Sequence, residues 1–191
     1  MNTLKITADE MKSRIARFSD RRRSPGYFDD PTIPSEACRS VVPEIYLVMG
    51  EQTHYGTGDG RPPIPGERGT AMAMVECAPR YKAALHVHLR STEIFMCLKG
   101  RFEVRWNDAG EDRTMLEQFD TISIPPGLYR EFTNITDDTA LLLVVITGEA
   151  DDDGLVVAPH ETKRLTERFG ADVVDKLAAL TGFQFAGTAT K

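Results

Sequence analysis

The 191-residue chain is poor in cysteine and tryptophan and has no long apolar run. Its three cysteines, Cys38, Cys77 and Cys97, are widely spaced and include no CxxC pair, which excludes a disulfide framework and a structural zinc knuckle. No segment approaches the roughly 20 consecutive apolar residues of a membrane-spanning helix. The first residues also lack the apolar core and cleavage site of a secretory signal. We therefore expect reduced thiols, no membrane partner and a cytoplasmic location.

The net charge of −6 is unevenly distributed along the chain. Residues 1–25 hold seven Lys or Arg against three acidic residues and carry +4, which leaves −10 for residues 26–191. Because the body of the chain is acidic, we expect no nucleic-acid partner. The basic cluster Arg21–Arg23 has two interpretations: a solvated helix end, which we favour, and a contact with an acidic surface such as that of another subunit.

Residues 1–40 are predicted to form a helix and an extended arm. Thr7 and Glu10 form a capping box, so a helix should begin near Ala8. Its apolar positions share one stripe: Met11, Ile15 and Phe18. So little apolar surface cannot sustain an isolated helix, and we expect the helix to pack on the rest of the chain or on a neighbouring subunit. The proline-rich segment 24–43 is the expected arm, which can cross to a second copy in a homodimer.

Residues 41–148 are predicted to form an antiparallel sandwich or barrel. Short runs rich in Val, Ile, Phe, Tyr and Met alternate with turn residues there. The runs are EIYLVM, TAMAMVECA, YKAALHVHL, TEIFMCL, RFEVRW, DTISIP, LYREFT and ALLLVVIT. The Gly- and Pro-rich loop over residues 50–69 has the length of a binding lid. Residues 149–191 predict a helical tail, with Gly170 and Gly182 placed as helix C-caps. The length suits one globular domain overall.

The chemically informative stretch is His86-Val87-His88, followed by Glu93. Side chains alternate along a strand, so the two imidazoles should face the same side, about 6–7 Å apart along the backbone. The four residues before Glu93 allow a bend, after which its carboxylate can return to the same interior. Two His and one carboxylate form a facial triad that leaves coordination positions open for substrate and dioxygen. An isolated His-x-His pair is more often structural, so the surrounding sequence decides between the two interpretations.

That surrounding sequence resembles the cupin family. His86, His88, Glu93 and Gly100 match the metal and turn positions of the first cupin motif, although Arg80 stands where that motif begins with Gly. The Pro125-Pro126-Gly127 turn and Asn134 are similar to the second motif. The resemblance covers roughly residues 70–147 and implies an all-β cupin jelly-roll, or double-stranded β-helix, with the N-terminal and C-terminal helices outside it. It also implies a homodimer.

The second motif departs from the family at its histidine, where this chain has Arg130. A guanidinium stays protonated and has no lone pair, so Arg130 cannot be a metal ligand. Two arrangements follow. In the first, which we favour, His86, His88 and Glu93 hold the ion alone and Arg130 binds an anionic group of the substrate. In the second, Arg130 pairs with Glu93, withdraws a ligand and repels a divalent ion.

Five further residues are candidates for the pocket around this site. Phe95 and Cys97 share the face of Glu93 by alternation, and Phe132 shares that of Arg130. Cys97 is expected to be a small buried thiol rather than a ligand. Tyr129 should point away from the interior unless a bulge turns it inward. His54, in the long loop, is the candidate that could replace the missing ligand.

These residues favour a metal-dependent enzyme, with oxygenase-type chemistry on a small carboxylated or aromatic metabolite. Iron(II) is the favoured ion of such a dioxygenase-like oxidoreductase, and manganese, nickel or zinc suit the same ligands. Cupins also include binding modules, isomerases and lyases, so two alternatives stay open. One is a metal-free or non-catalytic cupin that binds an anionic small molecule, and the other is a metal-dependent isomerase or lyase.

Overall fold

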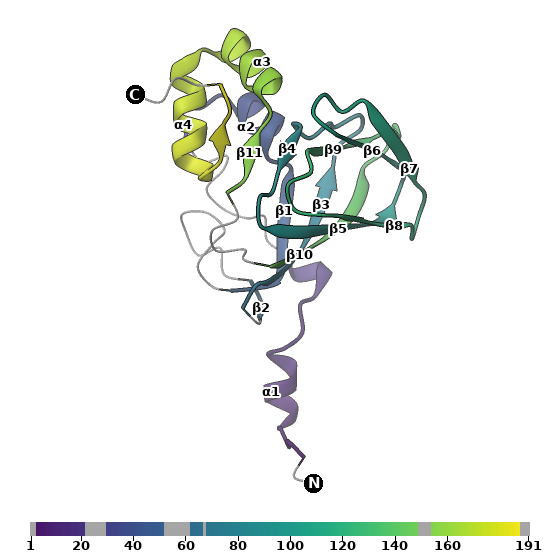
Figure 1. Cartoon of the computed structure of the whole chain (residues 1–191). Helices are drawn as coiled ribbons and strands as arrows, with labels where there is room; N and C mark the ends of the chain where they lie inside the picture. Colours follow the sequence, from purple (N-terminus) through teal and green to yellow (C-terminus); the bar gives the residue numbers. More distant parts are fainter. Residues whose placement is uncertain (1–2, 22–29, 52–61, 67, 149–153, 188–191) are drawn as a thin grey trace.

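The computed structural model describes residues 3–21, 30–51, 62–66, 68–148 and 154–187. Two six-stranded sheets face each other and form a barrel (Figure 1). The first sheet has the order β2-β1-β3-β10-β5-β8 and contains β1 (Glu44–Gly50), β2 (Ile64–Pro65), β3 (Thr70–Cys77), β5 (Ser91–Lys99), β8 (Thr121–Ile124) and β10 (Ala140–Gly148). The second has the order β12-β11-β4-β9-β6-β7 and contains β4 (His86–Val87), β6 (Phe102–Trp106), β7 (Asp112–Leu116), β9 (Arg130–Asn134), β11 (Val156–Val157) and β12 (Gln184–Phe185). The predicted all-β jelly-roll barrel is confirmed.

The barrel interior follows from strict alternation along the longer strands. In β5 every second side chain from Ser91 to Cys97 is buried, and the residues between them are half-buried on the outside. The inward side chains of both sheets form the first hydrophobic core, which includes Phe95, Phe102, Phe132 and Leu142. Apolar burial of this kind is the main stabilising contribution to the fold.

Helices and the end of the tail cover one side of the barrel. They are α2 (Ser35–Val41), α3 (Pro159–Phe169) and α4 (Ala171–Thr181). A second hydrophobic core joins Cys38 of α2, Leu165 of α3, Leu177 of α4 and Phe185 of β12. The helix ends predicted at Gly170 and Gly182 are confirmed, and both glycines have positive φ. No helix within the described ranges is long and apolar enough to cross a membrane.

The prediction of an extended arm over residues 24–43 is wrong for its second half. Residues 35–41 form α2, because Ala37, Cys38 and Val41 are buried in the second core and Pro34 stands at the helix N-cap. The part of the predicted arm at 24–29 lies outside the described residues.

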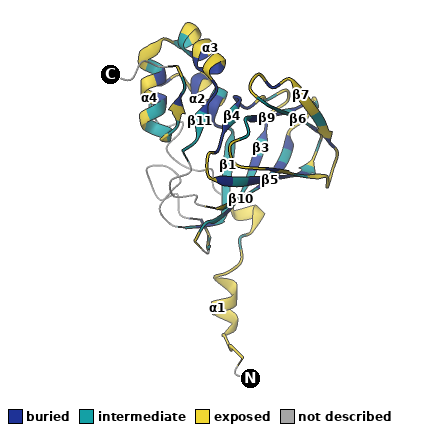
Figure 2. Ribbon diagram, in the orientation of Figure 1, coloured by how far each residue is buried: buried dark blue, intermediate teal, exposed yellow. Residues whose placement is uncertain are grey.

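The N-terminal helix is shorter than the predicted apolar stripe requires. The structure confirms its start and its Thr7–Glu10 capping box, but α1 (Ala8–Lys12) ends before Ile15 and Phe18. None of its residues is buried, and it projects away from the barrel (Figure 2). A helix without a packed face gains too little stabilising free energy from tertiary contacts to extend over many residues.

Several strands differ from the predicted runs. The run over residues 81–89 supplies only the two-residue strand β4. The polar edge strand β7 was not predicted, and neither were β2, β11 and β12, which have two residues each. The tail therefore contributes strands as well as helices, since β11 and β12 complete one edge of the second sheet.

Candidate metal centre

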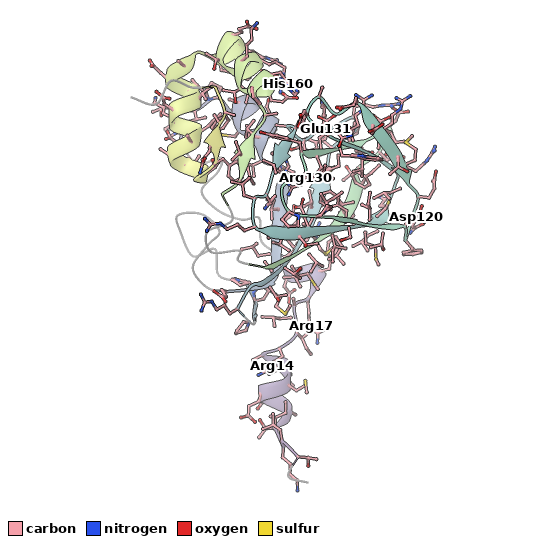
Figure 3. All side chains as sticks on the ribbon, in the orientation of Figure 1. Arg14, Arg17, Asp120, Arg130, Glu131 and His160 are labelled. Atoms are coloured by element: carbon pink, nitrogen blue, oxygen red, sulfur yellow. The ribbon has the colours of Figure 1, made fainter. Side chains whose placement is uncertain are left out.

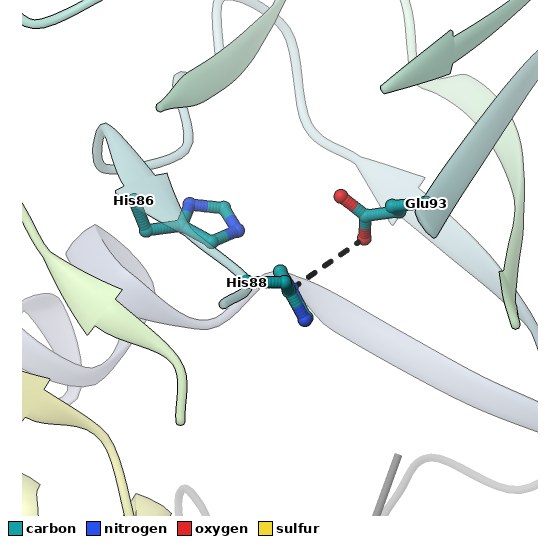
Figure 4. A group of neighbouring side chains, drawn as sticks. All are labelled: His86, His88 and Glu93. Carbon is teal, nitrogen blue, oxygen red and sulfur yellow. Dashed lines mark ion pairs between the residues drawn. The ribbon is translucent and has the colours of Figure 1, made fainter. Parts of the chain in front are cut away.

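His86 and His88 come from β4 and the residue that follows it, while Glu93 comes from β5 in the facing sheet. The two imidazole ring centroids lie 5.6 Å apart, and the rings are tilted by 56°. One ligand atom from each of the three residues can be chosen so that all lie within 4.8 Å of one another (Figure 4). Sequence alternation and the bend before β5 thus bring the three predicted residues together.

Local contacts orient both histidines. His86 Nδ1 lies 2.6 Å from the carbonyl oxygen of Ala84, which can only accept, so Nδ1 carries the proton and Nε2 has the lone pair in the neutral ring. His88 Nδ1 lies 3.4 Å from Ser91 Oγ, and its Nε2 lies 3.9 Å from Glu93 Oε1. A hydrogen bond at the second ring nitrogen is the usual way in which proteins orient metal-ligating histidines.

The spacing fits a first-row metal ion after small movements. Ligand bonds of about 2.0–2.2 Å keep two ligand atoms of one ion within roughly 4.4 Å of each other. The 3.9 Å between His88 Nε2 and Glu93 Oε1 lies inside that limit. The ligand atoms of the whole cluster lie within 4.8 Å of one another, a few tenths of an ångström more than two ligands of one ion allow. Rotation of one imidazole can close this difference. The donor set and its dimensions therefore suit a divalent ion.

Arg130 pairs with Glu93, as the second of the two predicted arrangements requires. Its side chain is only 1% exposed, and it donates to Glu93 Oε2 from both Nε (2.8 Å) and Nη2 (2.5 Å). Nη1 donates to the carbonyl oxygen of His86 at 3.2 Å. Arg130 Nη1 can contact the His86 carbonyl because His86 and Arg130 are directly paired between β4 and β9. These contacts join Arg130 to Glu93 and to the backbone of His86, and the contact with a substrate anion stays a prediction.

The two oxygens of Glu93 lie toward different residues of the site. Arg130 Nε and Nη2 donate to Oε2, whereas Oε1 lies 3.9 Å from His88 Nε2. A carboxylate has lone pairs on each oxygen, so one oxygen can be held by a guanidinium while the other faces the histidines. Pairing with Arg130 and metal ligation by Glu93 are therefore compatible in this geometry.

The predicted pocket residues are mostly core. Phe95 and Phe132 are buried and pack edge-on, with centroids 5.4 Å apart. Cys97 is buried four residues beyond Glu93, and its Sγ lies 3.4 Å from the carbonyl oxygen of Gly100. Burial raises the pKa of the Cys97 thiol, which suits the expected inert role. Tyr129 is half-buried, and its carbonyl accepts from the N–H of Asn107.

His54, the predicted replacement ligand, lies outside the described residues. Sequence reasoning missed Ser91, the partner of His88. The only signal in the sequence was a hydroxyl three residues after a histidine, which is too common to single out.

A group of charged residues behind the site was also missed. Arg130 and Glu131 are both buried although they are adjacent in β9 (Figure 3). Glu131 Oε2 lies 3.0 Å from Lys82 Nζ, and the same Nζ lies 3.5 Å from Glu161 Oε1 on α3. Glu161 also accepts from Arg164 at 2.7 Å. These pairs attach α3 to β9 and hold the strand that carries Arg130.

Comparisons with known proteins agree with this architecture. Residues 73–146 match the family model Cupin_2, described as a cupin domain. The chain matches no curated protein sequence. Residues 73–146 are therefore a cupin domain, as the two motifs predict.

Similar solved structures include a protein of Klebsiella pneumoniae subsp. pneumoniae MGH 78578 with a double-stranded β-helix domain. It is 17% identical, with a TM-score of 0.43, and the match covers 48% of this chain and 76% of that one. A recombinant oxalate oxidase in complex with glycolate is 28% identical, with a TM-score of 0.42. That match covers 58% of this chain and 62% of the oxalate oxidase.

Proposed function

We propose that this cupin is a metal-dependent enzyme with oxygenase-type chemistry on a small carboxylated or aromatic metabolite. The observation that carries the proposal is the convergence of His86, His88 and Glu93 from two facing sheets. Two imidazoles and one carboxylate are the donor set of non-haem iron(II) oxygenases. Iron(II) is the favoured ion, and manganese, nickel or zinc suit the same ligands.

Each residue has a separate task in this proposal. His86 and His88 present imidazole nitrogens whose orientation is set by the Ala84 carbonyl and by Ser91. Glu93 offers Oε1, while Arg130 fixes the carboxylate through Oε2. A divalent ion bound there would supply a Lewis acid for the substrate and, in an oxygenase, a source of electrons for dioxygen. Arg130 is a positioning residue, since it acts through Glu93 and the backbone of His86.

The charge balance favours an anionic substrate. Arg130 offsets the charge of Glu93, and neutral histidines add none, so a divalent ion would leave the centre with about two positive charges. Such an excess in a partly desolvated interior attracts carboxylates more strongly than a site in which the ligand charge offsets the ion. This supports the carboxylated class of substrate.

A second function is favoured by the same buried pair. If Arg130 and Glu93 satisfy each other without an ion, the domain is a metal-free cupin that binds an anionic small molecule. The full burial of Arg130 is the observation in its favour, because a buried cation requires a partner.

Anaerobic calorimetric titration with ferrous iron, followed by oxygen-uptake assays with carboxylated aromatics, separates these functions. The matched variants are His86→Ala and His160→Ala, since His160 is exposed at the start of α3 (Figure 3). The proposal predicts iron binding that His86→Ala abolishes and His160→Ala retains, with iron-dependent oxygen uptake. Turnover that needs the metal but not oxygen would indicate an isomerase or lyase. Absence of iron binding by the native chain would leave the anion-binding cupin.

A further inference from the structure

Strand β4, which carries His86, is held from both sides by other strands. It has two residues, and it lies between β9 and β11 in the second sheet. His86 is paired with Arg130 of β9 and with Val157 of β11. The N–H of Ala158 also donates to the carbonyl oxygen of Leu85 at 2.9 Å. The position of His86 therefore depends on β11 as well as on β9.

Strand β11 belongs to a part of the chain that the cupin match does not include. We call residues 155–186 the C-terminal unit; it contains β11, α3, α4 and β12 (Figure 1). Strand β12 pairs with β11 in parallel, and the N–H of Ala186 donates to the carbonyl oxygen of Val157 at 3.1 Å. The cupin match ends at residue 146. One neighbour of the His86 strand thus comes from outside the matched domain.

The second hydrophobic core reaches the residue that orients the His86 ring. Ala84, whose carbonyl oxygen lies 2.6 Å from His86 Nδ1, is buried in that core. The same core contains Leu165 of α3, Leu177 of α4 and Phe185 of β12. When a side chain is removed from a packed core, the residues around the cavity shift and relax only in part. Packing of the C-terminal unit is therefore coupled to the position of the Ala84 carbonyl.

A buried ionic network joins the C-terminal unit to the strand on the other side of β4. Lys82 Nζ lies 3.5 Å from Glu161 Oε1 on α3 and 3.0 Å from Glu131 Oε2 on β9. Both carboxylates are buried, and Glu131 directly follows Arg130. Buried charges require their partners, so the network resists separation of α3 from β9. The C-terminal unit thus contacts β4 through β11 and is tied to β9 through Lys82.

We propose that the C-terminal unit is a positioning element of the metal centre, which fixes the orientation of the His86 ring through β11 and the Ala84 carbonyl. This role rests on the proposed function, because His86 is a ligand only where the site binds an ion. A ring that must be ordered when the ion binds lowers the affinity, since the ordering costs free energy. Leu177 and Glu161 are positioning residues in this scheme, because they act through the second core and through Lys82.

Nuclear magnetic resonance of the metal-free, full-length chain tests the proposal at the His86 ring. The Nδ1 proton, held by the Ala84 carbonyl, should give a slowly exchanging resonance that is absent in His86→Ala. Leu177→Ala opens a cavity in the second core, and its His86 Nδ1 proton should exchange with water about tenfold faster. The matched control is Leu116→Ala, because Leu116 is buried in the first core on β7, at the opposite end of the second sheet. This control should keep the native exchange rate.

Glu161→Gln tests the ionic network without opening a cavity, and it carries the test if Leu177→Ala does not fold. Its His86 Nδ1 proton should also exchange faster than in the native chain. The matched control is Glu103→Gln, because Glu103 on β6 also pairs with two arginines, Arg105 and Arg113. Glu103→Gln should keep the native exchange rate. Circular dichroism checks that each variant is folded.

Anaerobic titration with ferrous iron gives a second readout. Leu177→Ala should bind the ion about tenfold more weakly than the native chain, and Leu116→Ala should bind it as tightly. A native exchange rate at His86 in folded Leu177→Ala and Glu161→Gln overturns the proposal, and so does an equal acceleration in Leu116→Ala. An iron affinity that Leu177→Ala leaves unchanged overturns it too. A native chain that binds no iron refutes the proposed function, while the metal-free resonance still decides whether the C-terminal unit positions His86.

Discussion

Replacing Arg130 with methionine should destabilise the protein strongly, because Glu93 would stay buried without its cation. The change removes two hydrogen bonds to Glu93 Oε2 and one to the His86 carbonyl. Removal of one partner of a buried ion pair costs about 3–5 kcal/mol. For a chain of this length, that cost corresponds to a fall in Tm of about 6–20 °C.

Urea unfolding of metal-free protein at neutral pH measures this loss. Arg113→Met is the matched control, since Arg113 lies on β7 with an exposed side chain and pairs with Glu103 at 3.3 Å. The free energy of unfolding of Arg113→Met should differ from the native value by less than about 1 kcal/mol, because exposed ion pairs contribute little to stability. Combining Arg130→Met with Glu93→Gln should recover on the order of 2 kcal/mol relative to the sum of the single changes. A free energy of unfolding for Arg130→Met within about 1 kcal/mol of the native value would show that Glu93 does not need its cation.

Three other predictions concern the stability and burial of the fold. Asn134→Ala should lower the free energy of unfolding by about 2–3 kcal/mol in urea, because the buried amide donates to three backbone carbonyls; a loss below about 1 kcal/mol would contradict this. Gly100→Ala should lower Tm more than Gly127→Ala, although both glycines have positive φ. A Cβ at position 100 would lie 2.7 Å from Ala140 Cβ, whereas a Cβ at position 127 would have no atom within 4 Å. Equal falls in Tm would contradict this prediction. Burial raises the pKa of all three thiols, so they should react with a thiol reagent only when the chain unfolds. The free energy of unfolding should also fall as the pH rises above 9.0, the ordinary pKa of a thiol, because the unfolded chain then loses protons before the folded chain does. Rapid labelling of the folded chain at pH 8 would refute the last prediction.

The barrel and the three candidate ligands could be predicted because both depend on local alternation. Period-2 patterns mark the longer buried strands, and the same alternation predicts one side for His86 in β4 and His88 directly after it. The capping box at Thr7 and the glycines after α3 and α4 are also local signals. Such features need no knowledge of the tertiary structure.

The remaining features depend on contacts between distant segments. Strands β11 and β12 have two residues each and exist only because they pair with each other and with β4. Helix α2 forms where three small apolar side chains meet the C-terminal helices. The partner of Arg130 is set by the register of β9 with β4 and by the position of β5 in the facing sheet. Sequence spacing left its two arrangements open, because it does not encode that cross-barrel distance.

The metal content of the chain is the most direct test of the three-ligand centre. Protein purified without chelators is reconstituted anaerobically with ferrous iron, desalted and analysed by elemental mass spectrometry, together with His86→Ala and His160→Ala. We expect about one ion per chain in the native protein and in His160→Ala, and loss of that ion in His86→Ala. A native chain that retains no ion, or a folded His86→Ala that retains as much as the native chain, would contradict the three-ligand centre.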